Sequence, residues 1–349
     1  MNKAVLISVL TLLLSVHYCV AQNSDAALYL TNYTFSTQTK AIGYIRIKGD
    51  AQALLKSVAI QGDYKDAFKI GKDHQLLIKP EKLKSSQMFF EVVLTASTSQ
   101  GPLTDTFHIV RDEFIHNKVI AHRGAWKNTG ASQNSIAALK QSIALGCEGS
   151  EFDVHMSADS VLVINHDASI QGISIAKTKY DSLKGIRLSN GELMPTLENF
   201  LKAGVQQNKT KLILEIKASE LGKASSIALS RRVVALVQRL HAQGWVDYIS
   251  FDYDVCKEVL RLAPYAKVSY LKGDKTPAEL SNDNFYGLDY HFSVLQKNPD
   301  WITEAKQKKL TLNVWTVNDT TTMNEMLQHK VDFITTDEPE LLLSLLPKK

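Results

Sequence analysis

Two short stretches of the chain concentrate residues that exchange protons and bind cations. VIAHRGAWKN carries His122, and GSEFDVHMSADSVLVINHD carries a second histidine, His166. The second stretch also holds Glu151 and Asp153. Histidines donate and accept protons near neutral pH, and carboxylates at i and i+2 of a strand face the same side, where they can hold one hard cation. The combination indicates metal-assisted cleavage of a phosphate ester.

The chain around these residues alternates between strand and helix patterns. Eight apolar runs are typical of strands, at 118–122, 149–154, 211–216, 247–252, 266–271, 286–290, 310–315 and 332–335. Helical patterns fill most of the gaps, at 134–145, 225–242, 254–263, 299–309 and 320–329. This alternation predicts an α/β fold, a (β/α)₈ TIM barrel, in which the carboxyl ends of the strands form the active-site face.

The second and third of these strands are separated by an unusually long connection. It contains an extra strand pattern, VLVIN, and a polar stretch over residues 168–195. Connections of this length are usually functional or separately packed. We therefore expect an insertion after the second strand that overhangs the barrel mouth.

Residues 22–113 have a different pattern, with strand character and almost no helical period. Segments such as AIGYIRIKG, MFFEVVLTAST and DTFHIVRD are separated by Gly-Asp and Gly-Pro turn signals. Short strands with frequent turns predict a small β-sandwich, and the order of motifs resembles a cadherin-like or Ig-like domain. The acidic calcium motifs of such domains are absent, so no calcium is expected there. The change of pattern near 112–118 predicts a domain boundary with few core contacts across it, followed by a catalytic domain over 114–349.

The chain begins with a pattern typical of secretion. In residues 1–21 one lysine precedes an apolar stretch too short for a membrane span. We expect a signal peptide cleaved after Ala21, an extracytoplasmic protein, periplasmic or secreted, and no stable membrane insertion. The alternative is a lipoprotein anchored through Cys19, which the bulky His17 and Tyr18 directly before it disfavour.

Composition narrows the function further. The net charge is +4 over 349 residues and no basic cluster stands out, so no nucleic-acid partner is expected. After cleavage two cysteines are left, Cys147 and Cys256, both expected on barrel helices. Two cysteines in a chain of this size do not form a disulfide framework, so we expect two free, mostly buried thiols.

From Lys118 to the C-terminus the motifs resemble the glycerophosphodiester phosphodiesterase family. That family carries a strand ending in H-R-G, then E-x-D, H-D and E-x-K. The same motifs occur here in that order, as His122-Arg123-Gly124, Glu151-Phe152-Asp153, His166-Asp167 and Glu215-Ile216-Lys217. Later family features also match, at Pro195-Thr196-Leu197, Ser250-Phe251-Asp252, residues 313–318 (NVWTVN) and residues 335–339 (TTDEP). The order of the motifs is more specific than any one of them.

The resemblance implies a metal site. The family holds one divalent cation on three carboxylates, which are Glu151, Asp153 and Glu215 here. Three carboxylates confined without a cation would repel one another and take up protons, and Ca²⁺ or Mg²⁺ removes that problem. Each acidic residue taken alone could instead be an ordinary solvated loop charge.

The resemblance also implies that His122 and His166 are the acid–base pair. One takes a proton from the attacking oxygen, which is a substrate hydroxyl or water, and the other protonates the leaving alkoxide. We assign the base to His166 and the acid to His122, although the sequence does not decide between this assignment and its reverse. Two ordinary structural histidines are the alternative. His155 shares the strand parity of Asp153 but matches no family position.

Three further residues are expected to contact the substrate. Arg123 and Lys217 oppose the negative charge of the diester, and Trp315 lines the pocket for the glycerol or head group. The alternatives are ion pairs with nearby carboxylates for Arg123 and Lys217, and ordinary barrel core for Trp315. Gln133 stands where the family has the glutamate of Pro-Glu-Asn-Thr, so substrate preference and rate are expected to change more than the fold.

These residues favour metal-dependent hydrolysis of glycerophosphodiesters to glycerol 3-phosphate and an alcohol. A phospholipase C/D-type lipid phosphodiesterase is the second hypothesis, disfavoured by the polar insertion. The third is a non-catalytic protein that binds a surface through its β domain, disfavoured by the intact catalytic motifs. The expected partner is a small-molecule diester, with the β domain as a candidate for surface or protein contact.

Overall fold

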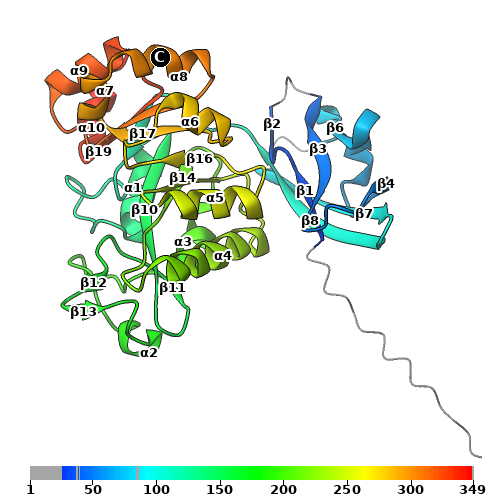
Figure 1. The fold of residues 1–349 in the computed structure, drawn as a ribbon, viewed down its shortest axis with the longest axis horizontal. Coiled ribbons are helices and arrows are strands. Elements are labelled where there is room, and N and C mark those ends of the chain that lie inside the picture. Colours follow the sequence, from blue (N-terminus) through cyan, green and yellow to red (C-terminus); the bar gives the residue numbers. More distant parts are fainter. Residues whose placement is uncertain (1–25, 37, 39, 84–85, 348–349) are drawn as a thin grey trace, which may run out of the picture.

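The computed structural model describes residues 26–36, 38, 40–83 and 86–347. An eight-stranded parallel barrel surrounded by helices follows two small sheets at the N-terminal side (Figure 1). The expected signal peptide, residues 1–21, lies outside the described residues. None of the helices in the described ranges combines the length and the apolar character needed to cross a bilayer.

All eight predicted barrel strands are confirmed, with small shifts at their ends. They are β9 (Val119–Ala121), β10 (Gly149–Met156), β14 (Lys211–Ile216), β15 (Val246–Ser250), β16 (Val268–Tyr270), β17 (Gly287–His291), β18 (Thr311–Trp315) and β19 (Phe333–Thr336). Neighbours in space pair in parallel, and β9 pairs with both β10 and β19, which closes the barrel. The strands were recognisable because both faces of a closed parallel sheet are covered, which gives short apolar runs.

Most of the α-helices lie between the barrel strands in sequence and on the outside of the barrel. They are α1 (Ile136–Leu145), α2 (Tyr180–Leu183), α3 (Leu197–Gly204), α4 (Lys223–Arg239), α5 (Tyr253–Leu262), α6 (Pro277–Asn282), α7 (Phe292–Lys297), α8 (Asp300–Gln307), α9 (Thr320–Gln328) and α10 (Pro339–Leu345). The five predicted helices correspond to α1, α4, α5, α8 and α9. Of the others, α2, α6, α7 and α10 complete fewer than two turns, too few for the apolar period to repeat in the sequence.

Both cysteines of the described residues are free and buried, as expected. Cys256 is on α5, but the expectation of a helical position for Cys147 is wrong. The helix α1 ends before it, at Gly146, which adopts the left-handed conformation with φ 75°. A left-handed glycine is a common helix end because it lacks the Cβ atom that strains this conformation.

The insertion after the second strand is present and has its own small core. Its first strand, β11 (Leu162–Ile164), pairs antiparallel with the end of β10. The hairpin β12 (Ser169–Ile170) and β13 (Ile173–Ser174) follows, and then α2. Apolar side chains of this segment bury one another, namely Val163, Ile170, Ile175, Leu183, Ile186 and Met194. Ser189 Oγ lies 2.7 Å from Ser132 Oγ in the loop after β9, so the insertion borders the barrel mouth.

The N-terminal residues form two four-stranded sheets. One has the order β1 (Ala27–Leu30), β3 (Ala41–Lys48), β6 (Gln75–Ile78), β5 (Phe68–Ile70), and the other the order β2 (Thr34–Phe35), β8 (Gly101–Arg111), β7 (Phe89–Thr98), β4 (Leu55–Gln61). Buried side chains of both sheets share one cluster, which includes Leu30, Ile45, Leu76, Phe90 and Leu94. Alternating burial along β7 matches the period of two expected for a strand with one face on a core.

The prediction that few core contacts cross the boundary near residue 112 is wrong. The ring of Phe89 lies 5.8 Å from that of the fully buried Trp245, and the Tyr33 and Tyr265 rings are 4.7 Å apart. Val110, at the end of β8, belongs to the core of the barrel. The sequence shows that these side chains are apolar but not which surface covers them. The β domain therefore packs on the barrel through an apolar interface.

A glycine at this interface permits a direct test of the packing. A Cβ atom at Gly244 would lie 2.4 Å from Val110 Cγ2 and 3.1 Å from the backbone oxygen of Tyr33. Because a methyl group has no room there, Gly244→Ala is expected to lower the free energy of unfolding by about 1–3 kcal/mol, measured by denaturant titration. Gly185→Ala is the control, since a Cβ atom there meets nothing within 4 Å. Equal stability of both variants would contradict a tightly packed interface.

Candidate active site

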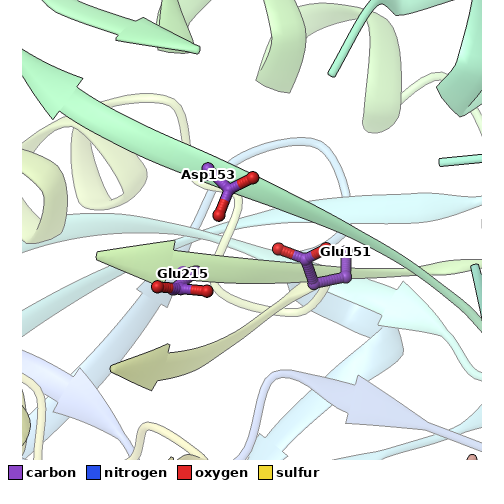
Figure 2. A group of neighbouring side chains, drawn as sticks. All are labelled: Glu151, Asp153 and Glu215. Atoms are coloured by element: carbon purple, nitrogen blue, oxygen red, sulfur yellow. The ribbon is translucent and has the colours of Figure 1, made fainter. Parts of the chain in front are cut away.

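Three carboxylates meet inside the barrel near the carboxyl ends of two neighbouring strands. Glu151 and Asp153 occupy alternate positions of β10 and face the barrel axis, while Phe152 between them packs in the core behind the sheet. Glu215 on β14 is in register with Asp153. Figure 2 shows the three side chains turned towards one another, and one oxygen from each lies within 4.8 Å of the others. The sheet register thus brings together the predicted metal ligands.

The hydrogen bonds of the three carboxylates are incomplete. Lys217 Nζ lies 3.1 Å from Asp153 Oδ1 and 2.8 Å from Glu215 Oε1. Asn134 Nδ2 donates to Asp153 Oδ2 at 2.8 Å, and the backbone N–H of Arg123 donates to Glu151 Oε2 at 2.7 Å. Glu151 Oε1 is buried and has no partner among the described residues. Buried oxygen atoms are nearly always paired, and carboxylate oxygens are the ligands that hard cations prefer. An unpaired oxygen among three buried carboxylates therefore fits a cation site.

Burial and mutual repulsion shift the pKa values of the three carboxyl groups. Burial, with repulsion from Asp153, raises the pKa of both Glu151 and Glu215. For Asp153 burial acts in the same direction, but Lys217 and Asn134 outweigh it and lower its pKa. Without a cation, two of the three carboxyl groups therefore favour the protonated form. A divalent cation with oxygen ligands would remove this penalty, so the residues fit the predicted site.

His122 follows β9 and is held by a carboxylate. Its Nδ1 atom lies 2.7 Å from Asp337 Oδ1, at the end of β19, and its Nε2 atom lies 4.0 Å from Glu151 Oε2. Burial opposes ionisation of Asp337, but the hydrogen bond and charge of His122, together with Asn318 and Arg123, outweigh burial and lower the Asp337 pKa. An ionised Asp337 accepts a hydrogen bond from Nδ1–H, which leaves Nε2 facing the carboxylates as the atom free to exchange a proton.

His166 lies beyond β11 and is also oriented by a carboxylate. Its Nδ1 atom is 2.7 Å from Asp167 Oδ1. Burial lowers the pKa of His166, and the positive charges of Lys217 and Arg123 act in the same direction against Asp153. The neutral ring, a proton acceptor, is therefore favoured. His155 Nε2 lies 3.1 Å from the backbone oxygen of His166, so His155 supports the loop and does not line the pocket.

One pocket contains all the predicted site residues except Asp153. Asp153 is only 1% exposed and is in contact with Lys217, which does line the pocket. The pocket is lined by His122, Arg123, Glu151, His166, Glu215, Lys217 and Trp315, together with Ile249, Phe251, Leu271, Asp289, Thr316 and Thr335. Residues that are more than 190 positions apart in the sequence thus share one cavity at the barrel mouth.

Arg123 reaches the pocket through a tight turn. Arg123 and Gly124 both have left-handed backbone conformations, with φ 56° and 80°. A non-glycine residue in this conformation is strained, which is most common at functional sites. The guanidinium donates from one terminal nitrogen to Gln133 Oε1 at 2.7 Å, and its buried Nε atom has no hydrogen-bond partner within the described chain. This Nε atom lies 3.9 Å from Asp153 Oδ2, so the ion pair with a nearby carboxylate is present, but it is too long for a hydrogen bond.

Trp315 contributes an aromatic wall. Its Nε1 atom donates to the backbone oxygen of Asp289 at 2.8 Å, and its ring meets those of Phe251 and His291 edge-on at 5.4 Å and 5.3 Å. Phe251 is 39% exposed, which is unusual for a phenylalanine. The wall gives the pocket an apolar side away from the carboxylates of β10.

The sequence left four polar residues of the site without a predicted role. Asn134 and Asp337 fix the orientation of Asp153 and His122, and Asp167 fixes that of His166. Asp167 adjoins His166 in the recognised H-D motif, so their partnership could have been inferred, whereas Asp337 lies in a recognised motif but 215 positions from His122. Asp289 is a buried carboxylate on the pocket wall, and no motif marks it.

The chain is similar to known phosphodiesterases. The family model described as the glycerophosphoryl diester phosphodiesterase family matches residues 122–341. A glycerophosphodiester phosphodiesterase of Caldanaerobacter subterraneus is 29% identical over 248 residues, covering 66% of this chain and 98% of the relative.

Solved structures show the same likeness. The crystal structure of a glycerophosphodiester phosphodiesterase from Parabacteroides distasonis is 47% identical, with a TM-score of 0.64 over 66% of this chain and 97% of the other. A phosphodiesterase from Oleispira antarctica, solved with the product sn-glycerol-3-phosphate, is 25% identical, with a TM-score of 0.55 over 65% of this chain and 95% of the other. Because the family model spans more than half of its length, the chain belongs to the glycerophosphoryl diester phosphodiesterase family and is a phosphoric diester hydrolase.

Proposed function

We propose that this protein hydrolyses soluble glycerophosphodiesters to glycerol 3-phosphate and an alcohol, with one divalent cation, Ca²⁺ or Mg²⁺. The observation that carries the proposal is the meeting of three buried carboxylates within 4.8 Å of one another, in contact with a pocket that holds two histidines. The relative solved with sn-glycerol-3-phosphate supports the substrate class. Release of glycerol 3-phosphate from glycerophosphocholine, glycerophosphoethanolamine, glycerophosphoglycerol and glycerophosphoinositol tests it.

Glu151, Asp153 and Glu215 would hold the cation. When bound, the cation polarises a phosphate oxygen and offsets the charge that develops on it. Lys217 keeps the ligand carboxylates in place, because its ammonium group contacts both Asp153 and Glu215. The Oε1 atom of Glu151 accepts no hydrogen bond from a described residue, so it would be available as a ligand of the cation.

Arg123 and Lys217 bind the phosphate of the substrate. The buried Nε atom of Arg123 donates no hydrogen bond to a described residue and lies 3.9 Å from Asp153 Oδ2 in a long ion pair, and a guanidinium can present two parallel donors to a phosphate. Both residues line the pocket beside the carboxylates. Trp315 covers the organic part of the diester on the apolar side.

The two histidines divide the proton transfers. His166, whose neutral form is favoured, takes a proton from the attacking oxygen, either water or a substrate hydroxyl, as the new P–O bond forms. His122 gives a proton from Nε2 to the leaving alkoxide oxygen as the old P–O bond breaks. Asp337 stabilises the charged ring of His122 before that transfer. An alkoxide is a poor leaving group, so a positioned acid is worth about 10²–10⁴ in rate.

Gln133 is expected to influence phosphate affinity through Arg123. Its neutral amide contacts the guanidinium at 2.7 Å, so it does not neutralise the charge. Gln133→Glu would create an ion pair there and raise KM for a diester about 3- to 10-fold, with kcat less affected. Steady-state kinetics measure this, and Gln171→Glu, which places the same charge on the insertion, is the control. Unchanged KM would show that Arg123 does not bind the phosphate.

A lipid phosphodiesterase is the second candidate function. Ile173 and Leu193 on the insertion and Leu221 after β14 are 38%, 48% and 52% exposed, and a hydrogen bond between Ser174 and Glu220 holds the loops of Ile173 and Leu221 together. Three side chains are few beside the patches of several hundred Å² that mark membrane contact. Turnover of deacylated diesters compared with lipid vesicles separates the two functions, and any turnover excludes a purely binding protein.

The domain organisation and location belong to the same proposal. Residues 1–21 serve as a signal peptide, residues 22–113 as a cadherin-like β-sandwich and residues 114–349 as the catalytic domain. The two packed N-terminal sheets support the second of these assignments. The protein then works outside the cytoplasm, with the β domain free on its outer side for surface or protein contact. A mature N-terminus other than Gln22 would contradict the cleavage site.

A further inference from the structure

A further buried carboxylate, Asp289, lines the active-site pocket, and the proposed reaction does not use it. Asp289 lies on β17 between Leu288 and Tyr290, whose side chains pack in the core behind the sheet. Because neighbouring side chains of a strand alternate, Asp289 faces the barrel axis. It is 2% exposed. The carboxylate is therefore inside the barrel, on the wall that β17 contributes to the pocket.

Asp289 and its neighbour have acceptor atoms that nothing satisfies. Asn313 on β18 is in register with Asp289 and faces the barrel axis as well. The amide nitrogen of Asn313 donates to Thr335 Oγ1 at 2.8 Å. The Oδ1 atoms of Asp289 and Asn313 are both buried and accept no hydrogen bond from any described residue. Buried acceptors in native proteins are nearly always paired, so two neighbouring exceptions indicate a missing donor.

The position of Asp289 makes it the floor of the active-site pocket. A second cavity begins at Asp289 and Asn313 and extends towards the amino ends of the strands, past Ser269 to Lys211 and Lys267. Asp289 and the apolar Ile249 line both this cavity and the active-site pocket, and Asp289 is the polar residue of the two. A group that enters from the barrel mouth and passes the phosphate site therefore reaches Asp289 last.

The charge around Asp289 determines what can bind there. It makes no ion pair with any described residue, and burial raises its pKa to about 7 against the hydrogen bond from Asn313. A phosphate would be repelled by its negative charge. The cation ligands lie on β10 and β14, which are not neighbours of β17 in the barrel. A hydrogen-bond donor, either a hydroxyl or an ammonium group, is the chemistry that fits the unpaired Oδ1 atom of Asp289 on the pocket wall.

We propose that Asp289 forms the inner end of the substrate site and accepts hydrogen bonds from hydroxyl or ammonium groups on the organic part of the diester, while Asn313 beside it lines only the lower cavity. The inference rests on the proposed function and extends it to substrate selection. A diester without such donors leaves the buried acceptor of Asp289 unpaired, which is the basis of strong discrimination in polar sites. The donor comes from the glycerol half or from the head group.

The test compares diesters with and without donor groups. Asp289→Asn keeps the size of the side chain and one acceptor but replaces the other oxygen by a donor. We expect kcat/KM to fall about 10- to 100-fold for glycerophosphocholine or glycerophosphoethanolamine. For bis(4-nitrophenyl) phosphate, which has no donor, the change should stay within about twofold. Ser269→Ala is the matched control, since Ser269 lines the lower cavity but not the active-site pocket.

The substrates also identify the source of the donor. Equal losses for the choline and ethanolamine compounds support the glycerol hydroxyls, because choline carries no N–H. A loss confined to glycerophosphoethanolamine supports the head-group ammonium. Two outcomes overturn the proposal: no loss with any substrate, or an equal loss with bis(4-nitrophenyl) phosphate, which would mean a general structural role for Asp289.

A binding measurement separates this proposal from the proposed function. Calorimetry on the wild-type protein should show glycerol 3-phosphate binding at least about tenfold more tightly than methyl phosphate, which lacks the hydroxyls. Equal affinities exclude the glycerol hydroxyls as the donor, and if phosphoethanolamine also binds no more tightly than phosphocholine, the inference is overturned even if Asp289→Asn fails to fold. A wild-type protein that cleaves bis(4-nitrophenyl) phosphate but no glycerophosphodiester contradicts the proposed function instead, and the binding comparison still decides the role of Asp289.

Discussion

Removal of divalent cations with a chelator is expected to abolish hydrolysis of glycerophosphodiesters, and Ca²⁺ or Mg²⁺ is expected to restore it. The physical reason is that burial and repulsion raise the pKa of Glu151 and Glu215, so the carboxylates need a cation to stay ionised together. The turnover rate should fall about 10²- to 10³-fold, because the cation is expected to stabilise the transition state by several kcal/mol. Full activity in excess chelator would contradict the metal site.

Glu215→Gln sharpens this test. It removes one of three negative charges, so cation affinity measured by calorimetry should fall at least about tenfold. The fold should survive, because the lost charge is one that burial already disfavours. Glu220→Gln is the matched control, since Glu220 follows the same strand but contacts the insertion through Ser174. Equal cation affinities of the two variants would place the metal elsewhere.

His122→Ala is expected to cripple turnover of substrates with alkoxide leaving groups and to affect nitrophenyl leaving groups much less. Nitrophenolate departs without a proton, whereas an alkoxide needs the acid that we assign to His122. The difference between the two leaving groups should be about 10²-fold or more, the usual size of general-acid catalysis. Steady-state kinetics on glycerophosphocholine and a nitrophenyl diester measure it.

His166→Ala is the counterpart of this experiment. Turnover of both substrates should fall, because the attacking oxygen needs a base whatever group leaves. If His122→Ala lowers the turnover of both substrates equally, the acid assignment is refuted. If instead the better leaving group restores turnover only in His166→Ala, the two assignments are reversed. Both variants should bind the cation as wild type does, since neither ring is among the proposed ligands. Loss of cation binding in either one would contradict the geometry of the site.

The barrel was predictable because its strands and longer helices have local patterns. Parallel strands covered on both faces give apolar runs, and helices of about ten residues or more repeat the apolar period. The short helices α2, α6 and α7 escaped prediction because they complete fewer than two turns. The interface between Phe89 and Trp245 escaped for a different reason, since an apolar side chain does not reveal which surface covers it.

Some residues of the active site were also predictable from local patterns. A motif whose residues lie close together in the sequence, such as E-x-D on β10, identified candidate ligands, because the alternation of a strand places both carboxylates on one face. The sequence by itself thus determined the fold class, the family resemblance and the chemical types of the reacting groups.

Only the tertiary structure decided how distant segments meet. Closure of the barrel places Asp337 2.7 Å from His122, although 215 positions separate them, and register between β17 and β18 places Asp289 beside Asn313. Neither contact has a local signal, because pairing depends on which strands become neighbours and on their relative shift. Burial, and with it the shifted pKa of the carboxylates, likewise depends on the whole enclosure around each side chain.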